Sequence, residues 1–318
     1  MDLALRAAES MLVMMTLFGA ALALRSAKVL TEQHAGVFAK AITQLVLPAL
    51  VFGHLAAHRI SLEMLEGPAL MFSSSVLLMV LGYVAGRWVF RLPRPSLGAV
   101  VLCTGFTSAA FLGIALVEIV YPHDGDMEET VLIAELGVGV PVFILGPLIA
   151  AYFGVRDDGE AFSIVRGLVA YLRSPIFIAI VTGLLWGGLG LPTGGNLPLD
   201  VLFGVCKQLE GGLVPLVGLA VGLMLRPLPF VKLAPLIVFV GVAQLIVQPS
   251  YLAFSSDLLA LQPMQRESLL LQGAAPVATL PAIFCREYNC DAQLAASLIL
   301  ATTILAMGSI PLTVVWFG

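Results

Sequence analysis

Two segments of the sequence combine small, hydroxyl and helix-breaking residues inside otherwise apolar stretches, a composition that suits ligand binding. Residues 105–122 read GFTSAAFLGIALVEIVYP, and residues 272–288 read QGAAPVATLPAIFCREY. A proline inside a helix removes one backbone hydrogen bond and clashes with the preceding turn, which costs about 3 kcal/mol. Backbone groups released in this way need protein, water or a ligand as a partner. The alternative is a simple kink with close packing through small residues.

From these segments we select the residues that offer a hydroxyl, an amide, a close backbone approach or a helix break. The candidate substrate-binding residues are Thr107, Ser108, Gly113, Gln272, Pro276, Thr279 and Pro281.

A further candidate is Glu135, an acidic residue inside a third apolar stretch. A charge deep in lipid costs at least about 2.5–3.5 kcal/mol, so this carboxyl must face the protein interior, face water, or be protonated. One interpretation is that Glu135 exchanges a proton during transport. The other is a solvated carboxylate at the outer end of its helix.

Nothing in the sequence indicates catalysis, a metal or a cofactor. Cys103, Cys206, Cys285 and Cys290 show neither metal-ligand nor redox spacing, and we expect them to pack as apolar side chains. The sequence also lacks H-E-x-x-H, G-x-S-x-G and phosphate-binding glycine motifs. We therefore predict a protein that is not an enzyme and that carries no metal ion and no cofactor.

The composition places these candidates in a membrane protein. Of the 318 residues, 59% are apolar and 11% are charged, against about 45–50% and 25% in soluble domains. Mean hydropathy is +1.02. A spanning helix needs roughly 20 mostly apolar residues, and open sheets are excluded from lipid because their backbone groups would stay unpaired. The sequence therefore predicts an all-α integral membrane protein.

The apolar stretches predict ten transmembrane helices. They cover residues 9–25, 37–57, 68–90, 97–121, 130–152, 174–190, 199–225, 232–254, 266–288 and 292–316. The one long polar connection separates five helices from five. This predicts a first five-helix repeat at 1–153, a cytoplasmic linker at 154–173 and a second five-helix repeat at 174–318.

Internal similarity supports two related halves. Residues 45–53 read LVLPALVFG and residues 212–222 read GLVPLVGLAVG, which sets Pro48 and Pro215 167 residues apart. The same spacing relates the fourth predicted helix to the ninth. Because each half has an odd number of helices, the second half is expected to lie upside down relative to the first, as in many secondary transporters.

The positions of lysine and arginine predict the orientation, since cytoplasmic loops carry an excess of these residues. Most of them flank the odd-numbered connections, whereas the acidic run 124–129 lies on the other side. We therefore expect both termini outside, in a multi-pass protein of the cell inner (cytoplasmic) membrane. The net charge of −4 gives no indication of a nucleic-acid partner.

The sequence resembles the auxin efflux carrier family, which includes bacterial organic-acid carriers and the plant PIN proteins. The similarity covers nearly the whole chain and is strongest at LVLPALVF (45–52), FLGIAL (111–116) and the terminal run 275–312. The resemblance implies ten helices in two inverted repeats, with the fourth and ninth broken and crossing near the midplane. It also implies that a substrate carboxylate binds near that crossing. Family positions that often hold Asn are Ser108 and Leu280 here.

These observations predict a secondary transporter of a small organic anion (carboxylate), working by alternating access across the cytoplasmic membrane. An anion channel and a membrane sensor subunit are the alternatives. The expected partners are the organic anion, the lipid bilayer and a second copy in a homodimer.

Overall fold

The computed structural model of the chain describes residues 2–57, 63–114, 116–117, 127–155, 172–224 and 230–317. In these residues the regular secondary structure is helical, apart from an isolated antiparallel bridge between Thr107 and Val277. The all-helical prediction is therefore confirmed. The predicted linker at 154–173 lies almost entirely outside the described residues.

Six helical runs in the described part of the chain are long and apolar enough to cross a membrane. They are Glu32–Ala57, Glu66–Val89, Thr130–Phe153, Leu197–Ala220, Leu233–Leu258 and Ala292–Phe317. Two shorter apolar helices cover Met15–Ser26 and Pro175–Gly188. The remaining predicted spans, the fourth and the ninth, contain only shorter helical pieces in the described residues. The count of ten crossings and their inverted arrangement stay predictions.

The chain forms two compact units, and each draws helices from both halves of the sequence. One unit comprises residues 1–13, 66–167 and 225–318, and the other comprises 14–65 and 168–224. Each predicted repeat is one continuous half of the sequence, whereas each compact unit combines segments from both halves. The repeats are therefore a different division of the molecule, and they stay a prediction.

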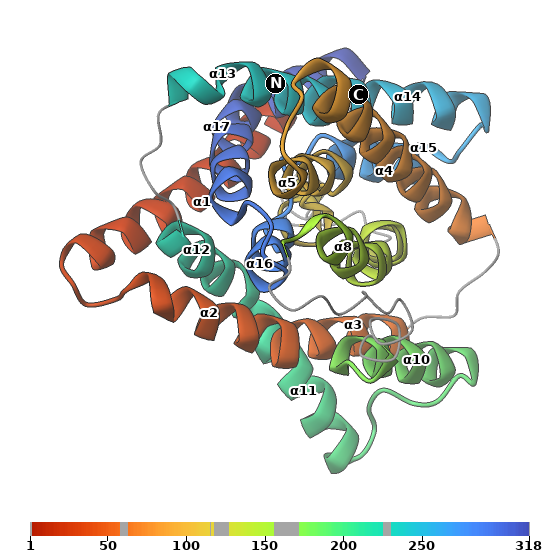
Figure 1. Cartoon of the computed structure of the whole chain (residues 1–318). Helices are drawn as coiled ribbons and strands as arrows, with labels where there is room; N and C mark the ends of the chain where they lie inside the picture. The colour runs from red at the N-terminus through yellow and green to blue at the C-terminus, as the bar shows by residue number, and fades with distance from the viewer. Residues whose placement is uncertain are drawn as a thin grey trace. The chain divides into compact units, whose positions relative to one another are not determined.

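The smaller unit packs helices from the two halves side by side. Its helices are α1 (Asp2–Ser26) from residue 14 onward, α2 (Glu32–Ala41), η1 (Ile42–Val46), α3 (Leu47–Ala57), α10 (Pro175–Gly188), α11 (Leu197–Gly211) and α12 (Leu213–Met224). In Figure 1, α3 runs beside α10, and the two helices share the most extensive contact between any two described helices. Gly183 makes this approach possible, because a β-carbon there would lie 2.9 Å from Leu55 Cβ.

Aromatic and ionic contacts add to the smaller unit. The ring of Phe52 lies 5.8 Å from Trp186 and 5.7 Å from Phe203. His54 Nε2 lies 2.9 Å from Glu210 Oε1, which joins α3 to α11. A one-residue interruption at Gly212, between the end of α11 at Gly211 and the start of α12 at Leu213, lies beside Glu210 within the helical run Leu197–Ala220.

The larger unit contains every candidate site residue. Its helices beyond α1 are α4 (Glu66–Val84), η3 (Ala85–Val89), α5 (Arg94–Gly105), η4 (Ala109–Gly113), α7 (Met127–Ala134), η5 (Glu135–Gly139), α8 (Val140–Phe153), α13 (Phe230–Val242), η6 (Ala243–Val247), α14 (Gln248–Leu258), α15 (Pro263–Gly273), α16 (Leu280–Glu287) and α17 (Ala292–Phe317). The segments η3, η4, η5 and η6 are single π-helical turns, a feature that is frequent at functional sites.

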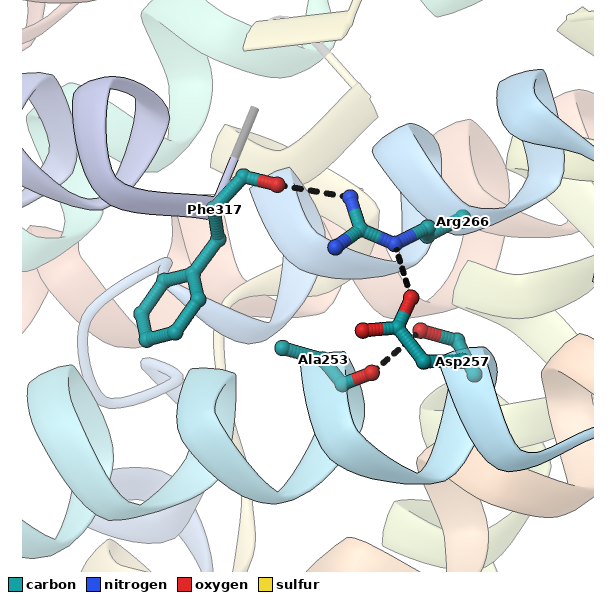
Figure 2. A network of polar contacts seen from close by, with 5 residues as sticks. Ala253, Asp257, Arg266 and Phe317 are labelled. Atoms are coloured by element: carbon teal, nitrogen blue, oxygen red, sulfur yellow. Dashed lines mark hydrogen bonds and ion pairs between the residues drawn. The ribbon is translucent and has the colours of Figure 1, made fainter.

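A polar network fixes the start of α15, as Figure 2 shows. Arg266 Nε donates to Asp257 Oδ1 at 2.7 Å, and Arg266 Nη1 donates to the backbone oxygen of Phe317 at 2.6 Å. Arg266 thereby joins the end of α14, the first turns of α15 and the end of α17. An exposed ion pair contributes only about 0–1 kcal/mol, so its main effect is to set the position of α15.

Candidate substrate site at two broken helices

The predicted fourth span is broken in the middle. The helix α5 ends at Gly105, Phe106 is extended with φ −121° and ψ 114°, and the helix restarts at Ala109 as η4. The three residues between the two helices, 106–108, are all buried. The fourth span therefore consists of two half-helices joined by extended chain.

The predicted ninth span is broken in the same manner. The helix α15 ends at Gly273 and α16 begins at Leu280. Pro276 lies in the connecting stretch, and Pro281 lies in the first turn of α16, where its missing N–H would have no partner in the helix anyway. Pro276 lies outside both helices and Pro281 is in a first turn, so neither proline kinks a helix interior, and the alternative of a simple proline kink is wrong for this segment.

The two breaks pair with each other through their backbones. Ser108 N donates to Pro276 O at 2.8 Å, and Ala278 N donates to Phe106 O at 2.8 Å. These reciprocal bonds form the antiparallel bridge between Thr107 and Val277. Each break thus provides hydrogen-bond partners for backbone groups that the other break leaves without a partner in a helix.

The hydroxyl of Thr107 strengthens this pairing. Its Oγ1 donates to Ala275 O at 2.8 Å, and the side chain is only 1% exposed. A second hydroxyl, Thr302 Oγ1 on α17, accepts from Val277 N at 3.4 Å. Because the Thr107 hydroxyl is used within the protein, we assign Thr107 to holding together the two breaks, 106–108 and 274–279, whose meeting point is called the crossing below.

Gly113 and Gln272 meet where η4 passes α15. A β-carbon on Gly113 would lie 2.8 Å from Gln272 Cγ and 3.1 Å from its Cα, so only glycine permits this approach. The Gln272 amide Nε2 donates to Thr130 O at 2.9 Å, which orients the side chain. Its Oε1 is buried without a hydrogen-bond partner among the described residues.

Glu135 is buried in the same unit. It opens the π-helical turn η5, is 2% exposed, and its Oε2 would lie 2.6 Å from a β-carbon on Gly139. The segment η5 packs against η4, the half-helix that follows the first break. The structure therefore places this carboxyl in the protein interior, and the interpretation as an outer, solvated carboxylate is wrong.

The structure brings most of the sequence-predicted residues together. Thr107, Ser108 and Pro276 take part in the backbone pairing, and Gly113 packs on Gln272. Thr279 is the N-cap residue of α16, half-buried and without a side-chain capping bond. Whether these residues contact a substrate stays a prediction.

Sequence reasoning missed three hydroxyl residues around the crossing. Thr302 accepts the bond from Val277 N, while Thr130 Oγ1 and Ser268 Oγ lie 2.9 Å apart and both are fully buried. The sequence feature that could have identified them is a hydroxyl residue inside a predicted apolar span. That signal is weak because such residues also pack helices together.

Glutamine supports the first break from a neighbouring helix. Gln244, in the π-helical turn η6, donates through Nε2 to Thr104 O at 2.6 Å and to Cys103 O at 3.2 Å. These are two of the carbonyls that α5 leaves unpaired when it ends. The broken helix is thus completed by a side chain 140 residues away.

Paired broken helices within a helical membrane protein are a recurring feature of secondary transporters, and comparison with known proteins places the chain in a transporter family. The family described as Membrane transport protein matches residues 8–163 and 161–314. The chain belongs to this family, which is that of the auxin efflux carriers.

Two archaeal relatives are similar over most of their length. An uncharacterised transporter of Methanocaldococcus jannaschii is 24% identical over 287 residues, which cover 88% of this chain and 88% of the relative. An uncharacterised transporter of Methanothermobacter thermautotrophicus is 24% identical over 290 residues, which cover 89% of each chain.

Proposed function

We propose that this multi-pass membrane transporter is a secondary carrier of a small organic anion, and that the anion binds where the two broken helices meet. The observation that supports this proposal best is the reciprocal pairing of Ser108 with Pro276 and of Ala278 with Phe106. Such pairing keeps irregular backbone inside a membrane protein, where it persists only when it is buried in protein or lines a cavity.

The chemistry of the crossing favours an anion. Two half-helices begin there, η4 at Ala109 and α16 at Leu280. The first N–H groups of a helix have no partner within it, and they carry a partial positive charge. Neither 105–114 nor 272–282 contains a basic side chain, so backbone N–H groups and the Ser108 hydroxyl would recognise the carboxylate.

The Gln272 amide completes the proposed site. Its buried Oε1 is an acceptor without a partner in the described residues, and such an atom costs about 1–3 kcal/mol when it stays unpaired. A hydroxyl or a protonated carboxyl on the substrate would supply the missing donor. This favours small hydroxy acids or acids that bind with one proton.

Transport is proposed to follow alternating access, with the two sequence halves inverted in the membrane and both termini outside. Membership of a transporter family favours a carrier over the anion channel and over the sensor subunit. The buried Glu135 beside η4 is the proposed proton-coupling group, since a carboxyl held away from water binds and releases protons according to its surroundings.

Uptake into proteoliposomes tests the proposal. Purified protein is reconstituted and offered labelled mono- and dicarboxylates, with and without a pH gradient. We expect saturable uptake of at least one acid, and we expect Ser108→Trp to abolish it because the new ring would fill the crossing. Ser250→Trp is the matched control, because that hydroxyl bonds Ile246 O within its own helix.

The result that contradicts the proposal is equally specific. If Ser108→Trp folds and transports like the parent, the binding site lies elsewhere. If the parent conducts steady currents far above carrier turnover, the protein is a channel.

A further inference from the structure

Two cysteines meet at the end of α16. The helix ends at Glu287, Tyr288 follows as its C-cap, and Asn289 adopts a left-handed backbone with φ +55°. Cys290 N then donates to Cys285 O at 2.8 Å. This six-residue closure is the Schellman arrangement, in which the side chains of its first and last residues commonly touch. Here both of those residues are cysteines.

The two thiols have different surroundings. Cys285 is fully buried, whereas Cys290 is partly exposed in the connection between α16 and α17. Cys285 is the strongest influence on the pKa of Cys290, and Cys290 Sγ donates to Ala150 O near the end of α8 at 3.1 Å. Gly98 provides the space, because a β-carbon there would lie 3.0 Å from Cys290 Sγ.

This arrangement activates the exposed thiol. The interaction with Cys285 lowers the pKa of Cys290 because it stabilises the thiolate, although partial burial and the negative charge of Asp291 act in the opposite direction. The thiolate is the nucleophilic form of cysteine, and oxidation-sensitive cysteines are typically accessible and next to a second thiol. Cys103 and Cys206 are both buried, which makes them internal references.

We propose that Cys285 and Cys290 form a redox-active pair, a covalent modification site that peroxides convert to a disulfide. The Cys290 thiolate attacks one peroxide oxygen, the O–O bond breaks, and Cys290 becomes a sulfenic acid as the first water leaves. The Cys285 thiol then attacks the sulfenic sulfur, which forms the S–S bond and releases the second water. Two thiols are oxidised and one hydrogen peroxide is reduced to two waters.

The disulfide would act on the half-helix that follows the crossing. It would fasten the last turn of α16 to the connection with α17, and it would withdraw Cys290 Sγ from Ala150 O. The helix α16 packs on α5 and α8, so the modification lies at a junction of three helices of the larger unit. This proposal is independent of which substrate is carried.

The test uses the full-length protein, purified in reduced form, treated with hydrogen peroxide, then denatured and alkylated with N-ethylmaleimide. We expect Cys285 and Cys290 to lose alkylation together and to appear in one linked peptide by mass spectrometry, while Cys103 and Cys206 stay alkylated. Dithiothreitol should restore alkylation at both positions. A non-reducing gel should show no linked dimer, because the bond forms within one chain.

Single variants separate the two roles. In Cys285→Ser, the sulfenic acid of Cys290 should persist and be trapped by dimedone; in Cys290→Ser, Cys285 should stay fully alkylated. Cys103→Ser should oxidise like the parent. The proposal is overturned if the peroxide-treated parent keeps both thiols alkylated, if Cys290 pairs with another cysteine, or if Cys285→Ser gives no dimedone adduct.

Discussion

At the scale of single residues, the polar groups at the crossing have two roles. Some hold the backbone in place, and others are available to bind a substrate. The Thr107 hydroxyl is used on Ala275 O. The Ser108 hydroxyl has no hydrogen bond within the described residues, although its backbone N–H is paired with Pro276 O. Thr107 is therefore a positioning residue, and Ser108 is the better candidate for direct contact with a substrate.

Thr107 offers a clean test of that role. Thr107→Val keeps the shape of the side chain but leaves Ala275 O without its donor, and an unpaired buried acceptor costs about 1–3 kcal/mol. We expect a lower melting temperature in detergent and reduced uptake. Thr107→Ser keeps the hydroxyl and should preserve both. Equal behaviour of the two variants would remove the hydroxyl from the explanation.

Glu135 is the residue to test for proton coupling. Glu135→Gln keeps the size of the side chain but cannot release a proton, so uptake should lose its dependence on a pH gradient while substrate exchange across the membrane continues. Glu267→Gln, a half-buried position on α15, is the control and should keep the dependence. If Glu135→Gln responds to pH like the parent, this carboxyl takes no part in coupling.

At the scale of elements, the site depends on helices that stop in the right place. The helix α15 is fixed at its start by Arg266 and passes η4 at Gly113. Its end at Gly273 leaves the stretch 274–279 free to pair with Phe106 and Ser108. The breaks are therefore part of the tertiary packing and are not local weaknesses of two helices.

Pro276 should be essential for the second break. Pro276→Ala adds an N–H that can donate to Gln272 O and extend α15 by one residue, which competes with the pairing to Ser108. We expect melting temperature to be kept or raised while uptake falls. Pro263→Ala is the matched control, because Pro263 is the first residue of α15, where a proline replaces no helix bond, and its uptake should stay near that of the parent.

Both quantities must be measured on the same purified samples. A proline that serves only as a structural kink predicts the reverse pattern for Pro276→Ala. Its melting temperature would fall, and the folded fraction would transport normally. That outcome would contradict the role assigned to the break.

At the scale of the whole molecule, the two compact units each combine helices from both halves of the sequence. Helices distant in sequence therefore form each unit, as α3 does with α10. The orientation that we predict for the helices in the membrane rests on charge alone, because cytoplasmic loops carry an excess of lysine and arginine.

Cysteine labelling tests that orientation. In a background without the native cysteines, a cysteine placed beside Asp124 should react with an impermeant thiol reagent added from outside, and one placed beside Arg94 should not. Uptake by each variant serves as the control for correct folding. The opposite labelling pattern would place both termini in the cytoplasm.

The sequence by itself determined the membrane class, the helical secondary structure and the two segments that break. Apolar composition and the need to pair every backbone group in lipid leave few other solutions. The small residues of 105–122 and the prolines of 272–288 marked these two segments, because such residues weaken a helix, and the family resemblance implied that both helices are broken.

Only the tertiary structure decided which atoms meet. The backbone pairing of Thr107 with Val277 joins residues 170 positions apart, and the contact of Cys285 with Cys290 depends on the left-handed turn at Asn289. The burial of Glu135 depends on packing against η4. Composition and spacing record local preference, whereas these contacts arise from how the helices pack, which a single sequence does not record.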